Sequence, residues 1–374
     1  MNQESIKTHL NHILQIADIH ADGNNPWDIK ILNQNFYPRL IKDGTLALGE
    51  SYVDGWWDCK RLDLFFERVF KANLESKIKS DKWLLLKLMM YKFVNMQTKT
   101  RSLEVGKVHY DLGNQLFECM LDHSMNYTCG YWRNAQTLDE AQTNKMQLTC
   151  DKLMLKPGMR LLDIGCGFGA LAKFAAQNYG VSVVGVTISK EQCEYAQNNC
   201  AGLPVEIRFQ DYRDVHEKFD RIVSLGMFEH VGYLNYHAYM NVVHECLADD
   251  GLFLLHTIGS NVSTTTCEAW FRKYIFPNGM LPSIRQIGDA SEKLFVMEDW
   301  HNFGADYEKT LMCWFENFNQ NWPQLRKQYD ERFYRMWSYY LLSCAGMFRA
   351  RLAQLWQIVF SKNGVQGGYH VPRL

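Results

Sequence analysis

Ionisable side chains stand directly after two of the apolar runs in this sequence. Glu229 and His230 follow the run RIVSLGMF, and His256 follows the run GLFLL. Such runs are typical of buried parallel strands, and open α/β sheets bind ligands beyond the carboxyl ends of their strands. A histidine beside apolar residues is more often a satisfied core group than a catalytic one. If the two strands are neighbours, however, Glu229 shares one cleft with His256, which we expect to end its strand.

A glycine-rich loop with an acid before it lies in the segment DIGCGFGA (163–170). Glycines let the backbone turn sharply and approach a ligand at the N-terminus of the following helix. The string also satisfies G-x-G-x-x-A, but a dinucleotide site would have an acidic residue at the end of the second strand, where this chain has Thr187. The loop instead resembles the S-adenosylmethionine-binding loop of methyltransferases.

That resemblance implies cofactor contacts after each of the first three strands. The residues are Asp163, Gly165, Gly167 and Gly169 at the amino-acid end of S-adenosylmethionine, Thr187 and Gln192 at its ribose, and Asp211 at its adenine, with Tyr212 as a further cofactor-binding residue.

The elements around these residues alternate between strand and helix patterns. Five β-branched or aliphatic runs, at 160–165, 181–189, 205–211, 219–226 and 251–259, are separated by helical stretches, and runs at 295–300 and 355–362 could add two late strands. This pattern predicts an α/β fold with a doubly wound, seven-stranded, Rossmann-like sheet.

The chain before this sheet predicts a separate domain. Residues 1–70 predict a small, mainly helical N-terminal domain with a candidate core of Trp56, Trp57, Phe65 and Phe66. Residues 71–107 form a basic linker, and the catalytic domain spans 108–374.

Composition excludes several classes of protein. The 374 residues carry 40 Lys+Arg against 41 Asp+Glu, so no basic face predicts a nucleic-acid partner. The longest apolar stretch, 83–94, is shorter than the roughly 20 residues of a spanning helix and contains two lysines. Eleven scattered cysteines without a C-x-x-C pair predict a reduced, cytoplasmic protein with no metal site.

The chemistry of a carboxylate, a histidine and many aromatic residues depends on the methyl acceptor. Methylation of nitrogen or oxygen needs little beyond positioning and a base. Methylation of an unactivated C=C bond leaves a carbocation, which aromatic faces and fixed negative charge stabilise until a base removes a proton.

Motifs along nearly the whole chain indicate which family this sequence resembles. They read LGESYVDGWWDCKRLDLFF, HYDLGN, MNYTCGYW, LDIGCGFG, VVGVTIS, QDYRD, DRIVSLGMFEHVG, FLLHTIGS, YIFPNGMLPS, HNFGADYEKTLMCWFENF and FRARLAQLWQIVFS. Together they closely resemble the bacterial cyclopropane-fatty-acyl-phospholipid synthases. The loop departs from the commoner family form, with GFGA for GWGG, and TCGYW replaces SCAYW; we expect small effects on cofactor affinity from both.

The resemblance implies a bicarbonate ion that takes a proton as the cyclopropane ring closes. Its cage would consist of Cys129, Glu229, His256, Ile258 and Tyr307. His256 and Tyr307 can donate hydrogen bonds to the anion, and Glu229 can accept one. We interpret Cys129 as a wall residue because this reaction needs no covalent thiol.

Three further residues are implied near the cofactor. Tyr127 and Thr128 would touch the amino-acid end of S-adenosylmethionine, and Tyr110 is a weaker candidate for the same pocket.

The implied partners are membrane phospholipids with cis-unsaturated acyl chains. We therefore expect a cytoplasmic homodimer that makes transient, peripheral contact with the inner membrane surface, with Arg272, Lys273 and Arg285 as candidate phosphate-binding cations. The alternatives are C-methylation of the same chains, N-methylation of a small amine, and a non-catalytic lipid-binding or cofactor-binding protein. The last would predict loss of Glu229, His256 or Tyr307, all of which are present.

Overall fold

The computed structural model describes residues 3–74, 113–277 and 279–372, which form two compact units. The described residues of the first unit are 3–74, 113, 268–277 and 314–352. Those of the second unit are 114–267, 279–313 and 353–372. The predicted basic linker lies mostly outside the described residues, so the boundaries at 70 and 108 stay a prediction.

The second unit is built on a seven-stranded sheet in the order β5-β4-β3-β6-β7-β9-β8. The strands are β3 (Arg160–Ile164), β4 (Ser182–Thr187), β5 (Val205–Phe209), β6 (Phe219–Leu225), β7 (Leu247–Ser260), β8 (Val296–Asn302) and β9 (Ala353–Ser361). The first five strands in this order, β5, β4, β3, β6 and β7, are parallel to one another. β9 runs antiparallel to both β7 and β8. The predicted doubly wound, seven-stranded fold is confirmed.

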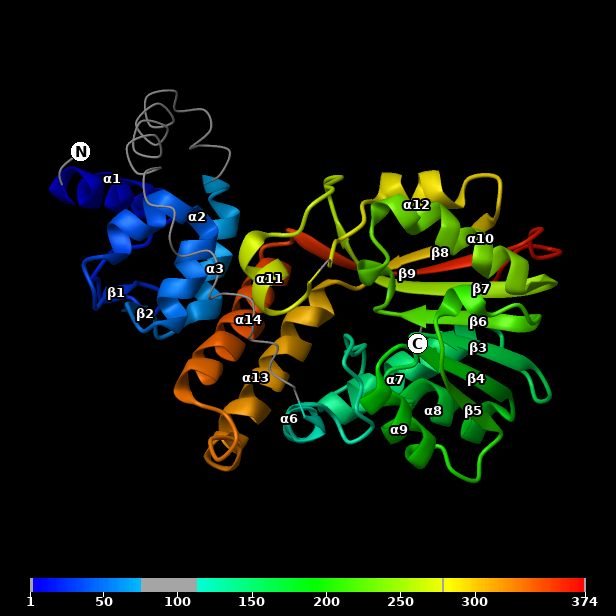
Figure 1. The fold of residues 1–374 in the computed structure, drawn as a ribbon. Helices are drawn as coiled ribbons and strands as arrows, with labels where there is room; N and C mark the ends of the chain where they lie inside the picture. The colour runs from blue at the N-terminus through cyan, green and yellow to red at the C-terminus, as the bar shows by residue number, and fades with distance from the viewer. Residues whose placement is uncertain (1–2, 75–112, 278, 373–374) are drawn as a thin grey trace. The chain divides into compact units, whose positions relative to one another are not determined.

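Helices cover both faces of this sheet (Figure 1). One face packs against α7 (Leu138–Lys152), α8 (Ala170–Tyr179) and α9 (Lys190–Asn199), and the other against α10 (Tyr236–Cys246) and α12 (Ile284–Ser291). The remaining helices of this unit are α6 (Asn114–Met120), the first part of α13 (Ala305–Leu325), and the short 3-10 helices η1 (Tyr212–Asp214), η2 (Phe228–His230) and η3 (Tyr233–Asn235).

Alternation along β7 decides which face each side chain meets. Leu252 and Leu254 join the core under α7–α9, whereas Phe253 and Leu255 join the core under α10 and α12. Because side chains alternate along a strand, His256 points to the same side as Leu254, toward α7.

The prediction that His256 ends its strand is wrong. β7 continues to Ser260, because β9 pairs with it as far as the Ser260–Ala353 pair. The parallel pairing with β6, by contrast, stops at the pair Leu225–His256. Beyond His256, the backbone groups of β7 on the β6 side are therefore open to other partners, and at Ser260 they bridge to the segment at Pro282 and Ser283.

The first unit is mainly helical. It contains α1 (Gln3–Ile16), β1 (Lys30–Ile31), α2 (Phe36–Val53), β2 (Trp57–Asp58), α3 (Leu62–Lys71), α11 (Ala269–Tyr274), the second part of α13, and α14 (Glu331–Arg349). Trp57, Phe65 and Phe66 are buried, as predicted. Trp56, also predicted in this core, is only half-buried, and the guanidinium of Arg39 lies over its ring at 4.7 Å from the centroid.

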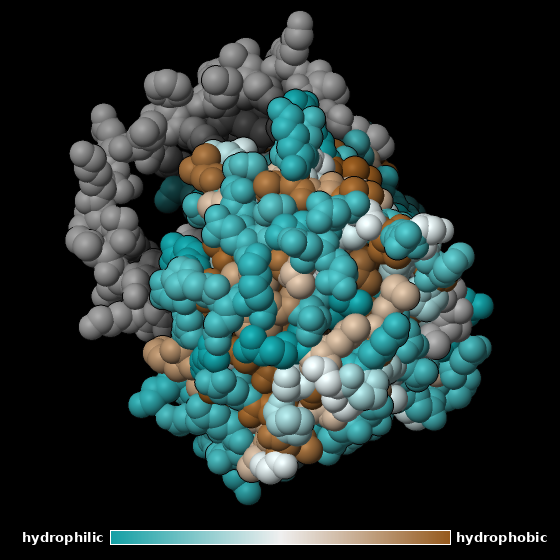
Figure 2. Space-filling view, turned by 90° about the vertical axis from the view of Figure 1, so that its right-hand side faces the viewer, coloured by the Kyte–Doolittle hydropathy of each residue, from teal (hydrophilic) through white to brown (hydrophobic). Residues whose placement is uncertain are grey.

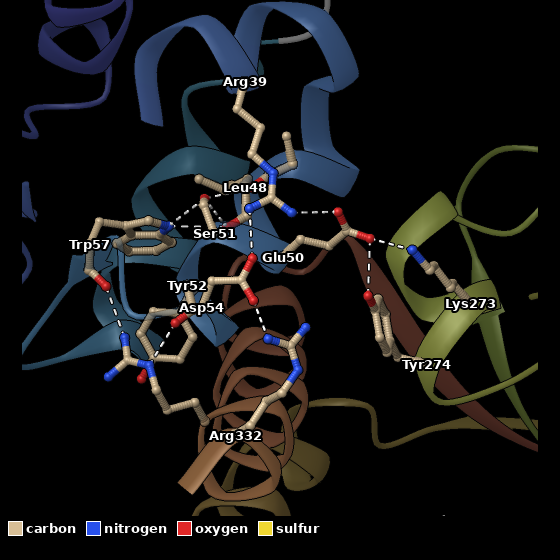
Figure 3. Close-up of polar contacts among 12 residues, drawn as sticks. Arg39, Leu48, Glu50, Ser51, Tyr52, Asp54, Trp57, Lys273, Tyr274 and Arg332 are labelled. Atoms are coloured by element: carbon tan, nitrogen blue, oxygen red, sulfur yellow. Dashed lines mark hydrogen bonds and ion pairs between the residues drawn. The ribbon is translucent and has the colours of Figure 1, made fainter. Parts of the chain in front are cut away.

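A network of ion pairs joins α2, α11 and α14 (Figure 3). The Arg39 guanidinium donates to Glu50 at 2.8 Å and to Asp54 at 2.7 Å, while Lys273 pairs with Glu50 and Arg332 with Asp54. Burial opposes the ionisation of Glu50, but the hydrogen bonds from Lys273 and Arg39 outweigh it and lower the pKa of this carboxyl. Lys273, a candidate phosphate-binding cation, is therefore committed to Glu50.

The surface carries both hydrophilic and apolar residues. In the view of Figure 2, hydrophilic side chains dominate, with apolar areas separated between them. Across the described residues, no helix combines the length and the apolar character needed to cross a membrane. All eleven cysteines are free thiols.

Candidate active site

Glu229 lies in η2, directly after β6, and its carboxylate reaches the edge of β7. Its Oε1 accepts a hydrogen bond from the backbone N–H of Ile258 at 2.7 Å. This N–H is available because the pairing between β6 and β7 stops two residues earlier, at His256. The other oxygen, Oε2, is buried and has no hydrogen-bond partner among the described residues. Burial raises the pKa of Glu229 to about 7.

His256 is 1% exposed and lies opposite Gln357 in the ladder between β7 and β9. Its Nδ1 is 3.4 Å from Gln357 Nε2, and its Nε2 is buried with no partner among the described residues. Burial, together with the positive charges of Lys145 and Lys152, lowers the pKa of His256 well below its usual value. The imidazole is therefore neutral at physiological pH, and both it and Glu229 present an unpaired polar atom.

Cys129 is fully buried beside the first part of α13. Its Sγ donates to the carbonyl of Gly130 at 3.1 Å and lies 3.8 Å from Thr310 Oγ1. Burial raises the pKa of the thiol well above its usual value, so the nucleophilic thiolate is not formed at neutral pH. This environment supports the interpretation of Cys129 as a wall residue.

The first turns of α13 hold the segment that carries Cys129. Asp306 accepts from the backbone N–H of Trp132 at 2.8 Å, and Thr310 Oγ1 accepts from Gly130 N at 3.1 Å and from Trp132 Nε1 at 2.9 Å. Tyr307 lies between these two anchors along α13 and is 8% exposed. Its place in an anion cage stays a prediction.

The loop between β3 and α8 has the shape that a cofactor cradle needs. Gly165, Gly167 and Gly169 have φ values of +81°, +54° and +81°, in the left-handed region that favours glycine. A Cβ on Gly165 would lie 2.8 Å from the Cβ of Met227, whereas a Cβ on Gly167 would meet nothing within 4 Å. The backbone at Gly167 is thus open to a ligand at the start of α8, and the residues present fit a cofactor there.

Two buried charges lie near this loop. Asp163 is 2% exposed, and burial raises its pKa to about 7, an effect that the charge of Lys145 opposes. Lys145, on α7, is fully buried and donates from Nζ to Asn126 Oδ1 at 2.8 Å and to Thr128 Oγ1 at 2.9 Å. Burial lowers the pKa of Lys145 to about 8.

Lys145 and the rest of a polar stripe on α7 were not among the residues predicted from the sequence. Gln142, Lys145, Thr149 and Lys152 are all completely buried and recur at helical spacing. Gln142 Nε2 donates to the carbonyl of Thr128 at 2.8 Å, and Lys152 pairs with Asp299 at 3.1 Å. Polar residues spaced three and four apart within a helix could have revealed this stripe, since such spacing places them on one face.

The residues predicted at the ribose lie together. Thr187 is buried at the end of β4, and its Oγ1 is 3.4 Å from Oε1 of Gln192 on α9.

Asp211, predicted to contact the adenine, is already bound by Arg213. Asp211 caps η1 and accepts from the backbone N–H and the side chain of Arg213, at 2.9 Å from N and 2.6 Å from Nη2. The ring of the neighbouring Tyr212 packs 5.1 Å from that of Tyr239.

Of the residues predicted beside Cys129, Thr128 is held by Lys145 and Gln142 of α7. The ring of Tyr127 lies 5.2 Å from Phe117, which in turn lies 5.5 Å from Phe168 of the glycine loop. Tyr110 lies outside the described residues.

Comparison with known proteins matches the family model described as mycolic acid cyclopropane synthetase over residues 97–358. The chain is 54% identical to the cyclopropane-fatty-acyl-phospholipid synthase of Escherichia coli (strain K12) over 363 residues, 97% of this chain and 95% of that protein.

Solved structures of cyclopropane synthases are also similar to this chain. The cyclopropane synthase MmaA2 from Mycobacterium tuberculosis is 32% identical, with a TM-score of 0.64 over 71% of this chain and 99% of that chain. The mycolic acid cyclopropane synthase CmaA1 complexed with SAH and CTAB is 34% identical, with a TM-score of 0.63 over 70% of this chain and 99% of that chain. The glycine cradle and the site formed by Glu229, after β6, and His256, on β7, agree with these similarities, which show that the chain belongs to the cyclopropane-fatty-acyl-phospholipid synthase family of S-adenosylmethionine-dependent methyltransferases.

Proposed function

We propose that this enzyme adds a methylene group from S-adenosylmethionine across a cis double bond in a phospholipid acyl chain, with bicarbonate-assisted deprotonation closing a cyclopropane ring. The observation that carries this proposal is the 54% identity to a cyclopropane-fatty-acyl-phospholipid synthase over 97% of the chain. S-adenosylmethionine, when bound, supplies an electrophilic methyl group.

The glycine cradle and the buried charges beside it would hold that cofactor. Gly167 leaves the backbone open at the start of α8, and Lys145 fixes the hydroxyl of Thr128. Asp163, at the end of β3, would face the cationic amino-acid end of the ligand, whose charge would favour the ionised carboxylate.

Glu229 and His256 would hold the anion. Each has one buried polar atom without a partner among the described residues, an arrangement that costs free energy unless a ligand satisfies it. Bicarbonate carries both acceptor oxygens and an O–H group, so a protonated His256 Nε2 can donate to it and Glu229 Oε2 can accept from it. Ile258 was also predicted in the cage, and its backbone N–H donates to Glu229 and so helps to hold that carboxylate in place.

Aromatic residues near His256 would stabilise the carbocation that methyl transfer leaves on the acyl chain. The ring centroid of Phe303 is 5.8 Å from that of His256 and 5.3 Å from that of Tyr131. Aromatic faces attract cations, and the effect grows when water is excluded.

The partners proposed for this enzyme follow from its substrate. It would work as a cytoplasmic homodimer in transient contact with the inner membrane surface. Arg272 and Arg285 are exposed and remain candidates for the phosphate of a headgroup. Arg285 lies 3.5 Å from the exposed Asp289, a contact that a phosphate could replace.

Purified protein incubated with S-adenosylmethionine and vesicles of mono-unsaturated phospholipid tests the function. The released acyl chains, analysed by mass spectrometry and proton NMR, should gain one CH2 and upfield ring protons while losing olefinic protons. A branched methyl or methylene signal would instead favour C-methylation of the same chains. If the vesicle lipids were unchanged under saturating cofactor and bicarbonate, the proposal would be wrong, and small amines would be the next acceptors to examine.

A further inference from the structure

The cross-strand partner of His256 is a glutamine. His256 on β7 and Gln357 on β9 are directly opposite in the antiparallel ladder, and both are almost completely buried. Opposed side chains on one face of such a ladder are in contact. Gln357 Nε2 lies 3.4 Å from His256 Nδ1, which identifies Gln357 as the polar neighbour of the ring nitrogen that faces away from the unpaired Nε2.

A threonine on α7 determines which way the Gln357 amide is turned. Thr149 Oγ1 donates its only proton to the backbone carbonyl of Lys145 at 2.8 Å. Its oxygen can then only accept, and Gln357 Nε2 lies 3.0 Å away. The amide group must therefore present its NH2 end, because a carbonyl oxygen at that position would face the lone pairs of Thr149. Turning the amide would also leave its two N–H donors at the buried Oε1 position, which has no partner among the described residues.

The orientation of the amide in turn determines the proton on His256. With an N–H of Gln357 directed at Nδ1, a proton on Nδ1 would place two donors against each other at 3.4 Å. Although this distance makes a long hydrogen bond, the opposed donors disfavour the alternative tautomer. A neutral imidazole has one N–H, which must then be on Nε2.

We propose that Gln357, oriented by Thr149, is a positioning residue that holds His256 in the tautomer with its proton on Nε2. The direction of donation runs from Gln357 to Thr149 to the Lys145 carbonyl, and from Gln357 to His256. The catalytic-site histidine thereby keeps a hydrogen-bond donor aimed away from β9. Its use as a donor to the anion rests on the proposed function, whereas the tautomer itself does not.

Nitrogen-15 NMR of histidine-labelled full-length protein tests the tautomer directly. The chain has 12 histidines, so the His256 signals are assigned as those missing from a His256→Gln spectrum. In the wild type, long-range proton–nitrogen correlations should show a protonated Nε2 and an unprotonated Nδ1. In Gln357→Glu, whose carboxylate can only accept, Nδ1 should become protonated. Thr149→Val, which lets the amide turn over, should give a mixture, and Thr149→Ser should restore the wild-type pattern.

A matched control uses the neighbouring buried glutamine of β9. Gln354 lies on the opposite face of the strand from Gln357 and accepts from Asn302 through Oε1, so Gln354→Glu introduces the same charge without touching His256. It should leave the His256 signals unchanged. A protonated Nδ1 in the wild type, or an unaltered Nε2–H form in both Gln357→Glu and Thr149→Val, would overturn the proposal. Should Gln357→Glu fail to fold, the wild-type and Thr149 spectra still decide the question.

Kinetics separate this proposal from the proposed function. In Gln357→Glu, the bicarbonate concentration for half-maximal activation should rise by about tenfold, the effect of one lost hydrogen bond to an anion, while the KM for S-adenosylmethionine stays within about twofold. A tautomer shift without any change in bicarbonate activation would leave the positioning role intact and contradict the anion role of His256. An unchanged tautomer with altered activation would contradict the positioning role instead.

Discussion

At the scale of single residues, Glu229 is the group expected to determine the acidic side of the pH–rate profile. Its pKa is about 7 because of burial, whereas His256 is already neutral over this range. If the ionised carboxylate accepts the proton-bearing oxygen of bicarbonate, kcat should fall as pH drops through about 7. The measurement is kcat against pH at saturating S-adenosylmethionine, with bicarbonate kept saturating because it also titrates in this range.

Glu229→Gln provides the control for that profile. Its Oε1 can still accept from Ile258, but it cannot titrate, so we expect kcat to be at least about tenfold lower and the acidic limb to disappear. An acidic limb that persists in Glu229→Gln would assign the titration to another group, with Asp163 the first to consider because its pKa is also about 7.

The same substitution should change the pH dependence of stability. The pKa of Glu229 is raised in the folded state above its unfolded value, so its stabilising contribution is present below the unfolded pKa and is lost as pH rises through about 7. Glu229→Gln removes this loss. Relative to the wild type, the variant should gain roughly 2–3 kcal/mol in free energy of unfolding between acidic and mildly alkaline pH. Denaturant unfolding at several pH values measures this difference, and parallel pH curves for the two proteins would refute it.

Cys129→Ala distinguishes a wall residue from a nucleophile. The thiol is buried and protonated, so we expect kcat to stay within about threefold and stability to fall by about 1 kcal/mol from the lost volume. Cys150→Ala, equally buried in the core under α7–α9, should show a similar stability loss. A fall in kcat by a factor of roughly 1,000 in the Cys129 variant alone would instead indicate covalent chemistry.

Residue types in motifs could be predicted, but their partners could not. Glu229 and His256 were found because ionisable groups after apolar runs are unusual. Lys145 was missed because a lysine in a polar helix normally faces water, and only the folded structure shows that it is fully buried. The bond between Glu229 and Ile258 depends on where β6 stops pairing with β7, which sequence periodicity does not specify.

At the scale of elements, the glycine loop allows a test with a matched control at the other end of β3. Gly167 and Gly158 both have positive φ, +54° and +86°, and a Cβ on either would meet nothing within 4 Å. Gly167→Ala and Gly158→Ala should therefore each cost about 1–2 kcal/mol of stability through backbone strain. Only Gly167 lies in the predicted cradle, so only its variant should raise the KM for S-adenosylmethionine, by about tenfold or more. Equal KM values for the two variants would place the cofactor elsewhere.

The doubly wound sheet is the part of the fold that the sequence predicted best. Repeated strand and helix patterns indicated a doubly wound sheet, and β6 and β7 are indeed neighbours. β7 spans Leu247–Ser260, beyond both ends of the predicted run 251–259, and its last four residues are paired with β9, which lies about 100 residues further along the chain. Long-range pairing of this kind leaves no signal in the local pattern.

At the scale of the whole molecule, a buried carboxylate in the first unit pairs with one arginine near it in sequence and with another far along the chain. Asp63 is 1% exposed and accepts from Arg61 and Arg349, each at 2.8 Å. Burial opposes its ionisation, but these hydrogen bonds outweigh that effect and lower its pKa. Its stabilising contribution is therefore present above the unfolded pKa and lost as pH falls through the folded value.

Asp63→Asn should lower the free energy of unfolding by about 2 kcal/mol at neutral pH, with a smaller difference in acid. Asp18→Asn is the control, because Asp18 also pairs with an arginine, Arg68, at 2.8 Å but has a side chain that is 66% exposed. Its effect should be within about 0.5 kcal/mol. Chemical denaturation followed by tryptophan fluorescence compares the two, and equal losses would contradict a structural role for the buried pair.

Which segments of the chain form the first unit could not be predicted from the sequence. Residues of its N-terminal helices form hydrogen bonds with residues far along the chain, at sequence separations of 223 for Glu50 and Lys273 and 286 for Asp63 and Arg349. Charged residues in the segments 268–277 and 314–352 were indistinguishable from solvated ones until their partners were known.

The measurement that tests methylene transfer most directly uses S-adenosylmethionine with a trideuterated methyl group and vesicles of mono-unsaturated phospholipid. Ring closure removes one deuteron, so mass spectrometry of the acyl product should show two retained deuterons, and NMR should show ring signals without olefinic protons. A product that keeps all three deuterons would mean that the enzyme leaves an intact methyl group on the chain, which would contradict the proposed ring closure.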